Sequence, residues 1–170
     1  MNPRRISRRE FAMGSAGLVT LGSLGCDGQS AQSEARKPGG AAKPPTEPFI
    51  VGPVDRFRAP GVYADFSKSK RVWVVSDGSM LVALGDLCTH KGCGLDFSDE
   101  DDQFHCPCHF SKFDLQGTNL SESKAKRPLE RWAIELAQTP DGPRVRIDPT
   151  RRFRKDLDQW SDPQTTLKLG

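Results

Sequence analysis

Several features that define common protein classes are missing from this sequence. It contains no nucleophile–base pair, phosphate-binding loop or substrate-pocket motif, so nothing supports a hydrolase or a transferase. No helix of three turns and no internal repeat can be identified, which excludes a helical bundle and a repeat array. The longest uncharged apolar stretch falls short of the ~20 apolar residues that span a membrane comfortably.

An excess of charge is also missing from the body of the chain. The formal net charge of the 170 residues is +3. Residues 1–26 contain four Arg and one Glu, which gives 4 − 1 = +3. The remainder has 25 − 4 = 21 basic and 22 − 1 = 21 acidic residues and is neutral. A neutral body carries no electrostatic footprint for DNA or RNA, so we expect no nucleic-acid partner.

The first 26 residues are organised like an export signal. Arginines precede an uncharged stretch of 15 residues, from Phe11 to Gly25, that includes four glycines. A basic start, a short apolar stretch and a small-residue end are typical of a signal peptide. Residues 7–11 (SRREF) resemble the twin-arginine signal of proteins that cross the membrane already folded. A basic amphipathic helix is the alternative, and the glycines argue against it.

This apolar stretch ends at Leu24-Gly25-Cys26, which resembles a lipoprotein box whose cysteine is lipidated. Ser23 stands where such boxes usually carry Leu, so a cleaved signal or an uncleaved anchor with an incidental cysteine is the alternative. Asp27 resembles the signal that keeps some lipoproteins in the inner membrane. We therefore expect an exported bacterial protein on the periplasmic side of the inner (cytoplasmic) membrane, attached through its N-terminus.

Residues 27–48 are predicted to be a disordered tether. They contain four prolines and no Val, Ile, Leu or aromatic residue, and cannot bury enough apolar surface to offset their ordering entropy. A flexible chain of this length would reach roughly 25 Å.

From Phe49 onward the pattern is that of β-strands. Residues 71–75 and 80–84 are apolar runs on either side of Asp77-Gly78, which predicts a hairpin. A second hairpin is predicted around Asp141-Gly142. The 16 Gly and 13 Pro suit a turn-rich all-β fold. We predict a small antiparallel β barrel or sandwich over residues 49–148. Residues 149–170 would be a C-terminal extension, packed loosely across the domain or serving as a docking segment.

Four of the five cysteines lie in two short boxes, residues 88–93 (CTHKGC) and 106–111 (CPCHFS). Each box follows a strand-like run, so we expect two loops at one end of the β domain. Thiolate ligands select zinc, Cu(I) or iron–sulfur clusters. Structural zinc sites usually use C-x₂₋₄-C and H-x₃₋₅-H pairs, which these boxes fit poorly. A [2Fe–2S] centre with two Cys on one iron and two His on the other fits well. A zinc-binding structural module remains the alternative.

The two boxes resemble those of the Rieske iron–sulfur proteins of quinol–cytochrome oxidoreductases, and the resemblance covers about residues 49–148. It implies one Rieske-type [2Fe–2S] cluster per chain. Cys88 and Cys106 would hold the inner iron, and His90 and His109 the outer, exposed iron.

The resemblance also assigns roles to residues around these four. Cys93 and Cys108 match a pair that forms a disulfide bracing the two loops, which an exported location permits. Ser111 matches a serine whose hydroxyl bonds a bridging sulfide and raises the potential. Phe113 stands where high-potential members carry a tyrosine donor, so we predict a potential below that of ubiquinol-type members.

The implied function is one-electron transfer. An exposed histidine on the outer iron can gain a proton when the cluster gains an electron, which suits a quinol donor. We therefore expect the iron–sulfur subunit of a membrane quinol–cytochrome c oxidoreductase of bc type, with cytochrome b, its quinol and a c-type cytochrome as partners. Such a subunit is not expected to be catalytic alone.

Two departures from the family pattern favour other functions. Lys91 occupies a tip position that is usually apolar in quinol-oxidising members, and Phe110 replaces the usual Gly. Residues 106–114 are similar to the small subunit of arsenite oxidases. The alternatives are therefore the electron-transfer subunit of a molybdenum oxidase, paired with its large subunit, and a stand-alone exported Rieske carrier.

Four further features have a structural or a functional interpretation. A third loop over the cluster, about residues 123–129, is unusually basic, either to meet an acidic partner or as a solvated charge run. His105 is expected to be structural. The acidic run 99–102 is expected to be a solvated loop rather than a steering patch for a cationic partner. Thr89 should shape the first loop through its hydroxyl.

Overall fold

The computed structural model describes residues 43–120 and 123–170. The export signal, Cys26 and most of the predicted tether lie outside these residues. The strands are β1 (Phe49–Pro53), β2 (Gly61–Tyr63), β3 (Val72–Ser76), β4 (Met80–Gly85), β5 (Asp96–Ser98), β6 (Gln103–His105), β7 (Lys112–Phe113), β8 (Arg131–Thr139), β9 (Gly142–Phe153) and β10 (Leu167–Lys168). The short helices are η1 (Val54–Phe57), α1 (Ser67–Lys70), η2 (Lys155–Leu157), η3 (Gln159–Ser161) and η4 (Pro163–Thr165).

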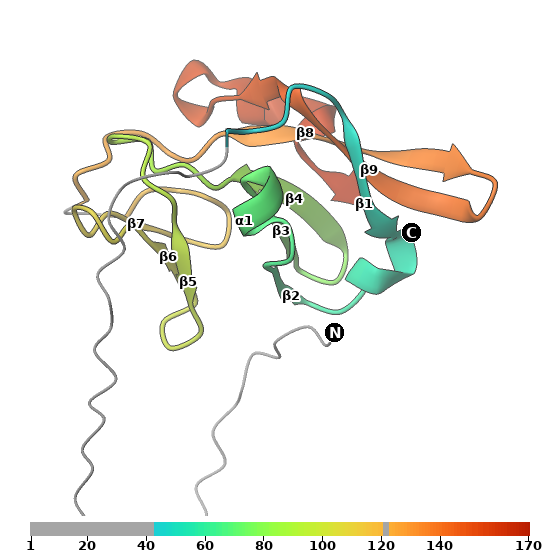
Figure 1. Cartoon of the computed structure of the whole chain (residues 1–170), viewed down its shortest axis with the longest axis horizontal. Helices are drawn as coiled ribbons and strands as arrows, with labels where there is room; N and C mark the ends of the chain where they lie inside the picture. The colour runs from blue at the N-terminus through green and yellow to red at the C-terminus, as the bar shows by residue number, and fades with distance from the viewer. Residues whose placement is uncertain (1–42, 121–122) are drawn as a thin grey trace, which may run out of the picture.

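The strands form two antiparallel sheets, a large curled one and a small one beside it (Figure 1). The large sheet has the order β1-β9-β8-β4-β3-β2, and β10 pairs with β4. The small sheet has the order β5-β6-β7. The prediction of a small antiparallel all-β fold is therefore confirmed. Both predicted hairpins are also confirmed, as β3–β4 and β8–β9.

The turn of the first hairpin is stabilised by Asp77, whose carboxylate accepts hydrogen bonds from the backbone N–H groups of Ser79 (2.8 Å) and Met80 (2.7 Å). These bonds to the charged form lower the pKa of Asp77. The Asp-Gly signal that predicted the hairpin thus acts through the aspartate side chain as well as through the glycine.

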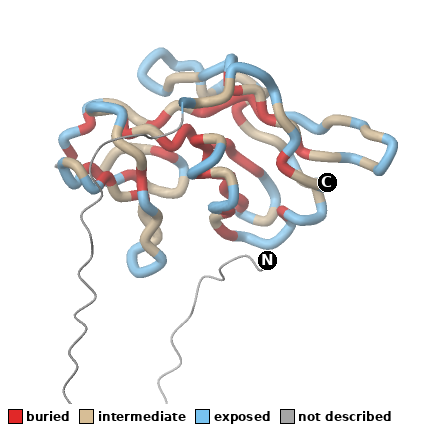
Figure 2. The backbone as a smooth tube through the Cα atoms, viewed as in Figure 1, coloured by how far each residue is buried: buried red, intermediate tan, exposed pale blue. Residues whose placement is uncertain are grey.

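Strand β3 is buried along its length (Figure 2). It is buried on both faces because it separates two hydrophobic cores. Val72 and Val74 pack in the first core, inside the curl of the large sheet. Trp73 packs in the second core, which lies between the two sheets and includes Cys88 and Cys106. Side chains alternate along a strand, so a strand between two cores carries an apolar residue at every position. The second core thereby joins the large sheet to the two cysteine boxes.

The C-terminal segment lies across the large sheet and adds a strand to it. Strand β9 continues to Phe153, beyond the predicted domain end at residue 148. Leu167 of β10 pairs with Leu81 of β4 and packs with Leu169 against the first core. The indole of Trp160 stacks on the guanidinium of Arg131 at 3.9 Å. In the described part of the chain no helix is long and apolar enough to cross a membrane.

Candidate metal centre

The first box forms a loop between β4 and β5 that is closed by two backbone hydrogen bonds. The N–H of Gly92 donates to the carbonyl of Cys88, and the N–H of Cys88 donates to the carbonyl of Cys93, both at 2.8 Å. Gly92 has a φ of 72°, which glycine adopts without steric cost.

The second box, between β6 and β7, is closed in the same way. The N–H of Phe110 donates to the carbonyl of Cys106 (2.9 Å), and the N–H of Cys106 donates to the carbonyl of Ser111 (2.8 Å). Phe110 stands at the position equivalent to Gly92 and has a φ of 58°. A residue with a Cβ in this conformation costs about 1–2 kcal/mol.

The two loops place the side chain of Cys88 beside that of Cys106, and the ring of His90 beside that of His109. Cys88 and Cys106 have free thiols that are 2% and 1% exposed, inside the second core. The rings of His90 and His109 lie further out, edge to face, with centroids 4.6 Å apart. The Nδ1 atom of His90 is buried and has no hydrogen-bond partner in the described part of the chain. Two inner thiols, two outer imidazoles and an unpartnered nitrogen fit a [2Fe–2S] cluster with mixed ligands.

Burial and neighbouring charges shift the pKa values of Cys88 and His90. Burial raises the pKa of the Cys88 thiol, against the effect of a hydrogen bond from the His90 backbone. The thiol also interacts with the Cys106 and Ser111 side chains. Desolvation, followed by the charge of His109, lowers the pKa of His90. The site therefore favours the neutral imidazole, the form that binds metals.

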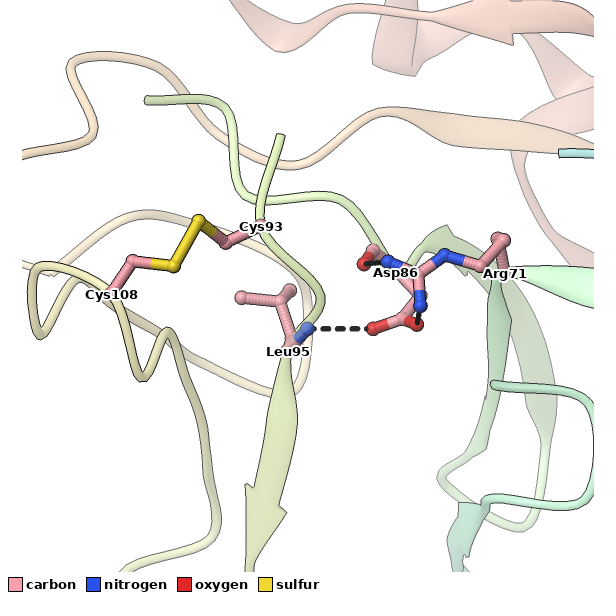
Figure 3. Close-up of a disulfide and its surroundings, with 5 residues drawn as sticks. All are labelled: Arg71, Asp86, Cys93, Leu95 and Cys108. Carbon is pink, nitrogen blue, oxygen red and sulfur yellow. Dashed lines mark hydrogen bonds and ion pairs between the residues drawn. A yellow bond between two sulfur atoms is a disulfide. The ribbon is translucent and has the colours of Figure 1, made fainter. Parts of the chain in front are cut away.

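A disulfide between Cys93 and Cys108 joins the two loops (Figure 3). This pairing was implied by the family resemblance, and the structure confirms it. The Sγ atoms of Cys93, Cys106 and Cys108 lie within 4.8 Å of one another. Because disulfide sulfurs have no thiolate to offer, Cys106 is the metal-ligating candidate of the three.

A buried ion pair supports the start and the end of the first loop (Figure 3). Arg71 Nη1 lies 2.9 Å from Asp86 Oδ2, and Asp86 Oδ1 accepts hydrogen bonds from Trp73 Nε1 (2.8 Å) and the N–H of Leu95 (2.9 Å). Burial raises the pKa of Asp86 to about 6, although these hydrogen bonds and Arg71 act in the opposite direction. A Cβ on Gly94 would come within 2.9 Å of Arg71, so the glycine leaves room for the guanidinium. Sequence reasoning missed this pair, whose signal was a charged residue before the first apolar run (Arg71) and another after the second (Asp86).

The third loop is tied to both boxes by hydrogen bonds. Thr89 Oγ1 donates to the carbonyl of Arg127 (2.6 Å), and the N–H of Ala125 donates to Ser111 Oγ (3.0 Å). Thr89 thus acts structurally, as predicted, although its partner is the third loop. Ser111 is fully buried.

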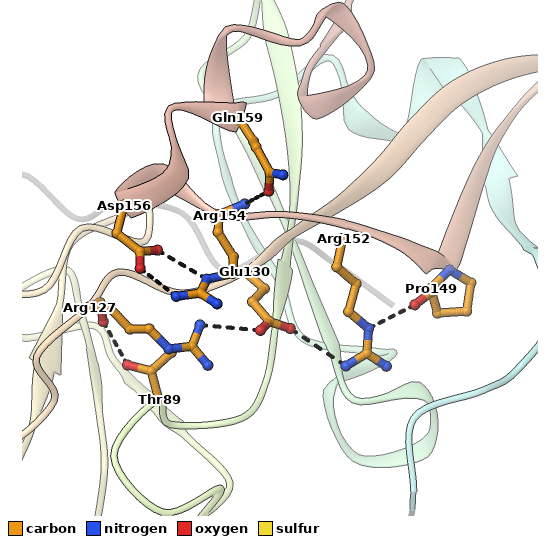
Figure 4. Close-up of polar contacts among 8 residues, drawn as sticks. All are labelled: Thr89, Arg127, Glu130, Pro149, Arg152, Arg154, Asp156 and Gln159. Atoms are coloured by element: carbon orange, nitrogen blue, oxygen red, sulfur yellow. Dashed lines mark hydrogen bonds and ion pairs between the residues drawn. The ribbon is translucent and has the colours of Figure 1, made fainter.

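A chain of charges continues from the third loop to β9 (Figure 4). Glu130 lies between Arg127 (3.2 Å) and Arg152 (3.5 Å). Arg154 makes two hydrogen bonds to Asp156. A cavity of about 320 Å³ lies between this chain of charges and the first loop, with Lys91 among its lining residues. The sequence did not reveal this network, because its members come from distant parts of the chain.

The remaining predicted residues have structural surroundings. Phe113 is fully buried in the second core. His105 lies in β6, and its Nε2 is 2.9 Å from the carboxylate of Asp101, which also binds Lys112 at 3.0 Å. His105 therefore stabilises the small sheet, and its side chain contacts Asp101, which lies outside the metal site.

Comparison with known proteins identifies a family for these loops. The family profile described as the Rieske [2Fe-2S] domain matches residues 48–133, which include both boxes and the third loop. The menaquinol:cytochrome c reductase iron–sulfur subunit of Bacillus subtilis is 31% identical over 72 residues, covering 41% of this chain and 43% of the relative. The cytochrome b6-f complex iron–sulfur subunit of Chlorobaculum thiosulfatiphilum is 43% identical over 66 residues, covering 39% of this chain and 36% of the relative.

A solved structure, the plasma membrane Rieske protein of the cyanobacterium Synechocystis, is 29% identical, with a TM-score of 0.37. The match covers 45% of this chain and 74% of that chain. The chain spans less than half of the length of the two curated relatives.

Proposed function

Because the chain belongs to the Rieske [2Fe–2S] family, we propose that it transfers single electrons as the iron–sulfur subunit of a membrane quinol–cytochrome c oxidoreductase of bc type. The observation that carries the proposal is the pairing of two buried thiols with two outer imidazoles on disulfide-braced loops. The cluster, when bound, supplies a centre that takes up and releases one electron.

In this proposal each residue of the site has a distinct role. Cys88 and Cys106 would hold the inner iron inside the second core, where apolar neighbours exclude water. His90 and His109 would hold the outer iron near the surface, where an electron could enter and leave. The disulfide keeps the two loops, and therefore the two pairs of ligands, in register.

The partners and the location belong to the same proposal. Relatives named as subunits of menaquinol:cytochrome c reductase and of the cytochrome b6-f complex support a quinol as donor and a cytochrome as acceptor. The N-terminal sequence supports twin-arginine export and attachment to the periplasmic side of the inner membrane, through an uncleaved helix or a lipid on Cys26. Residues 27–48 would let the cluster-bearing domain move between donor and acceptor.

Electron paramagnetic resonance of the reduced full chain tests the ligand set. The wild type should give a rhombic spectrum with the low average g of mixed Cys/His ligation. His90→Ala and His109→Ala should lose that spectrum, whereas His105→Ala should keep it, because His105 is bonded to Asp101 instead. A chain that contains stoichiometric zinc and gives no signal would contradict the proposal.

A second candidate function is electron transfer without quinol, in a molybdenum oxidase or as a stand-alone carrier. It is favoured by Lys91, which is exposed at the tip of the first loop. Purification of the tagged chain from solubilised membranes distinguishes the two candidate functions. Copurified b-type haem supports the oxidoreductase of bc type, whereas copurified molybdenum supports the second candidate.

A further inference from the structure

The three loops around the imidazoles present a basic face with one aromatic side chain at its tip. We call this the tip face and define it by Lys91, His109, Phe110, Lys124 and Lys126, all of which are exposed. Phe110 is 80% exposed, more than any other large hydrophobic residue in the described part of the chain.

The tip face carries positive charge that no described residue of its three loops neutralises. Residues 88–93, 106–111 and 123–129 contain no Asp or Glu. Lys91, Lys124 and Lys126 have no ion-pair partner among the described residues.

Phe110 has a left-handed backbone conformation that the loop-closing hydrogen bond to Cys106 holds, but its side chain is not packed against the fold. Its φ of 58° is left-handed, and the equivalent position of the first loop is occupied by Gly92, which needs no compensation. A strained backbone is normally offset by packing of the side chain, but this side chain is in solvent. A contact with a partner would give this exposed aromatic side chain a function.

We propose that the tip face is the docking surface for an acidic redox protein, one whose carboxylates surround an apolar patch at its exposed redox centre. This inference rests on the proposed function and names the chemistry of the electron acceptor. Lys91, Lys124 and Lys126 would steer and orient the partner, and Phe110 would enter its apolar patch.

The position of the imidazoles favours a redox protein over a layer of anionic lipid headgroups. His109 belongs to the tip face, so a partner that covers this face comes to the place where the outer iron is held. The cluster, when bound and reduced, would supply the one electron that reduces the oxidised centre of the partner. No bond forms or breaks in this step, and a proton that an imidazole gained on reduction would be released to solvent.

Cytochrome c provides a matched pair of probes, because succinylation converts its surface lysines into carboxylates around the same haem. The cluster-loaded full chain is reduced and mixed with each form in a stopped-flow instrument at several ionic strengths. The succinylated form should react at least about tenfold faster at low salt, and its rate should fall as salt is added. Titration calorimetry should show binding of the succinylated form alone.

Two triple variants, each of which removes three positive charges, test whether the preference for succinylated cytochrome c depends on the tip face. The triple variant Lys91→Gln, Lys124→Gln, Lys126→Gln should lose the preference for the succinylated form. The control triple variant Lys43→Gln, Lys68→Gln, Lys168→Gln, at exposed positions outside the three loops, should retain it.

Phe110→Gly tests whether Phe110 contributes to docking of the partner rather than to the stability of the fold. Because glycine relieves the left-handed strain, its melting temperature should be equal to or higher than that of the wild type. Its rate with succinylated cytochrome c should fall several-fold with an unchanged salt dependence, and Phe110→Leu should restore most of the loss. A residue with only a structural role would not give this combination.

Equal rates with both forms of cytochrome c, or a tip-face triple variant that behaves like the wild type, would overturn the inference. So would binding to phosphatidylglycerol vesicles without any preference between the two cytochromes. In each case a normal mixed-ligand spectrum would show that the proposed cluster is intact, so failure of the docking surface is distinct from failure of the proposed function.

Discussion

Ser111 shows how a single buried hydroxyl serves both the third loop and the candidate cluster. It is fully buried, accepts a hydrogen bond from the N–H of Ala125 and interacts with the Cys88 thiol. A hydroxyl in this place can donate to sulfur, and such a bond stabilises the more negative, reduced state. The potential of the cluster should therefore depend on it.

Ser111→Ala should lower the midpoint potential by roughly 40 mV. The lost hydrogen bond is worth about 1 kcal/mol, and a one-electron couple shifts by about 59 mV per tenfold change in equilibrium constant. Stability should fall by only about 1 kcal/mol, because Ser123 Oγ also accepts from the N–H of Ala125. An EPR-monitored titration measures the shift. Ser161→Ala, at an exposed hydroxyl, is the control, and equal midpoints in all three proteins would show that Ser111 does not reach the cluster.

Asp101 should make the protein more stable above about pH 4 than at lower pH. Although desolvation acts in the opposite direction, hydrogen bonds from Ser98 and Lys112 and the charge of His105 lower the pKa of Asp101 to about 2. Because the folded pKa lies below the ordinary 3.8, the contribution is complete above pH 4 and disappears as pH falls to about 2. Solvent screening keeps it below about 1 kcal/mol.

The melting temperature of Asp101→Asn tests this pH dependence. It should lie a few degrees below that of the wild type at pH 5, and the difference should shrink at pH 3. Glu100→Gln removes a neighbouring exposed carboxylate that has no ion-pair partner among the described residues, and it should show no such difference. A gap between Asp101→Asn and the wild type that widens toward acid would contradict the assignment.

At the scale of the elements, two loops at the end of separate strands are held together by one covalent bond. Each loop is closed by its own backbone hydrogen bonds, but those bonds do not fix one loop relative to the other. The disulfide does so, with the third loop as a further support through Thr89 and Ser111. The geometry of the four candidate ligands therefore depends on contacts between elements.

Replacement of both Cys93 and Cys108 by alanine should destabilise the protein by about 3 kcal/mol. The two residues are 15 positions apart, and a crosslink that closes a loop of this length restricts the unfolded chain by about that amount. Denaturant unfolding measures the loss, and the variant should also release iron to a chelator faster than the wild type. If reduction of the wild-type disulfide leaves both properties unchanged, the disulfide is not the brace between the loops.

At the scale of the whole molecule, the C-terminal segment is part of the sheet. Leu167 covers the first core beside the fully buried Leu81. Leu167→Ala should therefore reduce the free energy of unfolding by about 1–2 kcal/mol, since the side chain is only partly buried. Leu157→Ala, in the same segment but 55% exposed, should change it by less than about 0.5 kcal/mol. Equal effects, measured by denaturant unfolding, would contradict a structural role for β10.

Much of this molecule could be predicted from its sequence, because local chemistry specifies it. The Asp77-Gly78 and Asp141-Gly142 turns place both hairpins, since turn residues and the strands beside them interact over short distances. The two boxes likewise predict a site for a soft metal, because thiolate and imidazole side chains at this spacing are typical of metal ligands.

Other features were decided only by the tertiary structure, because they depend on pairs that are distant along the chain. The run at β3 predicts a strand, but only the fold shows that its alternate residues enter two different cores. The ion pair of Arg71 with Asp86 and the network around Glu130 form where separate elements meet. The sequence by itself thus determined the two hairpins and the kind of site. Folding decided which charges are buried, which loops are tied together and which residues of the tip remain exposed to a partner.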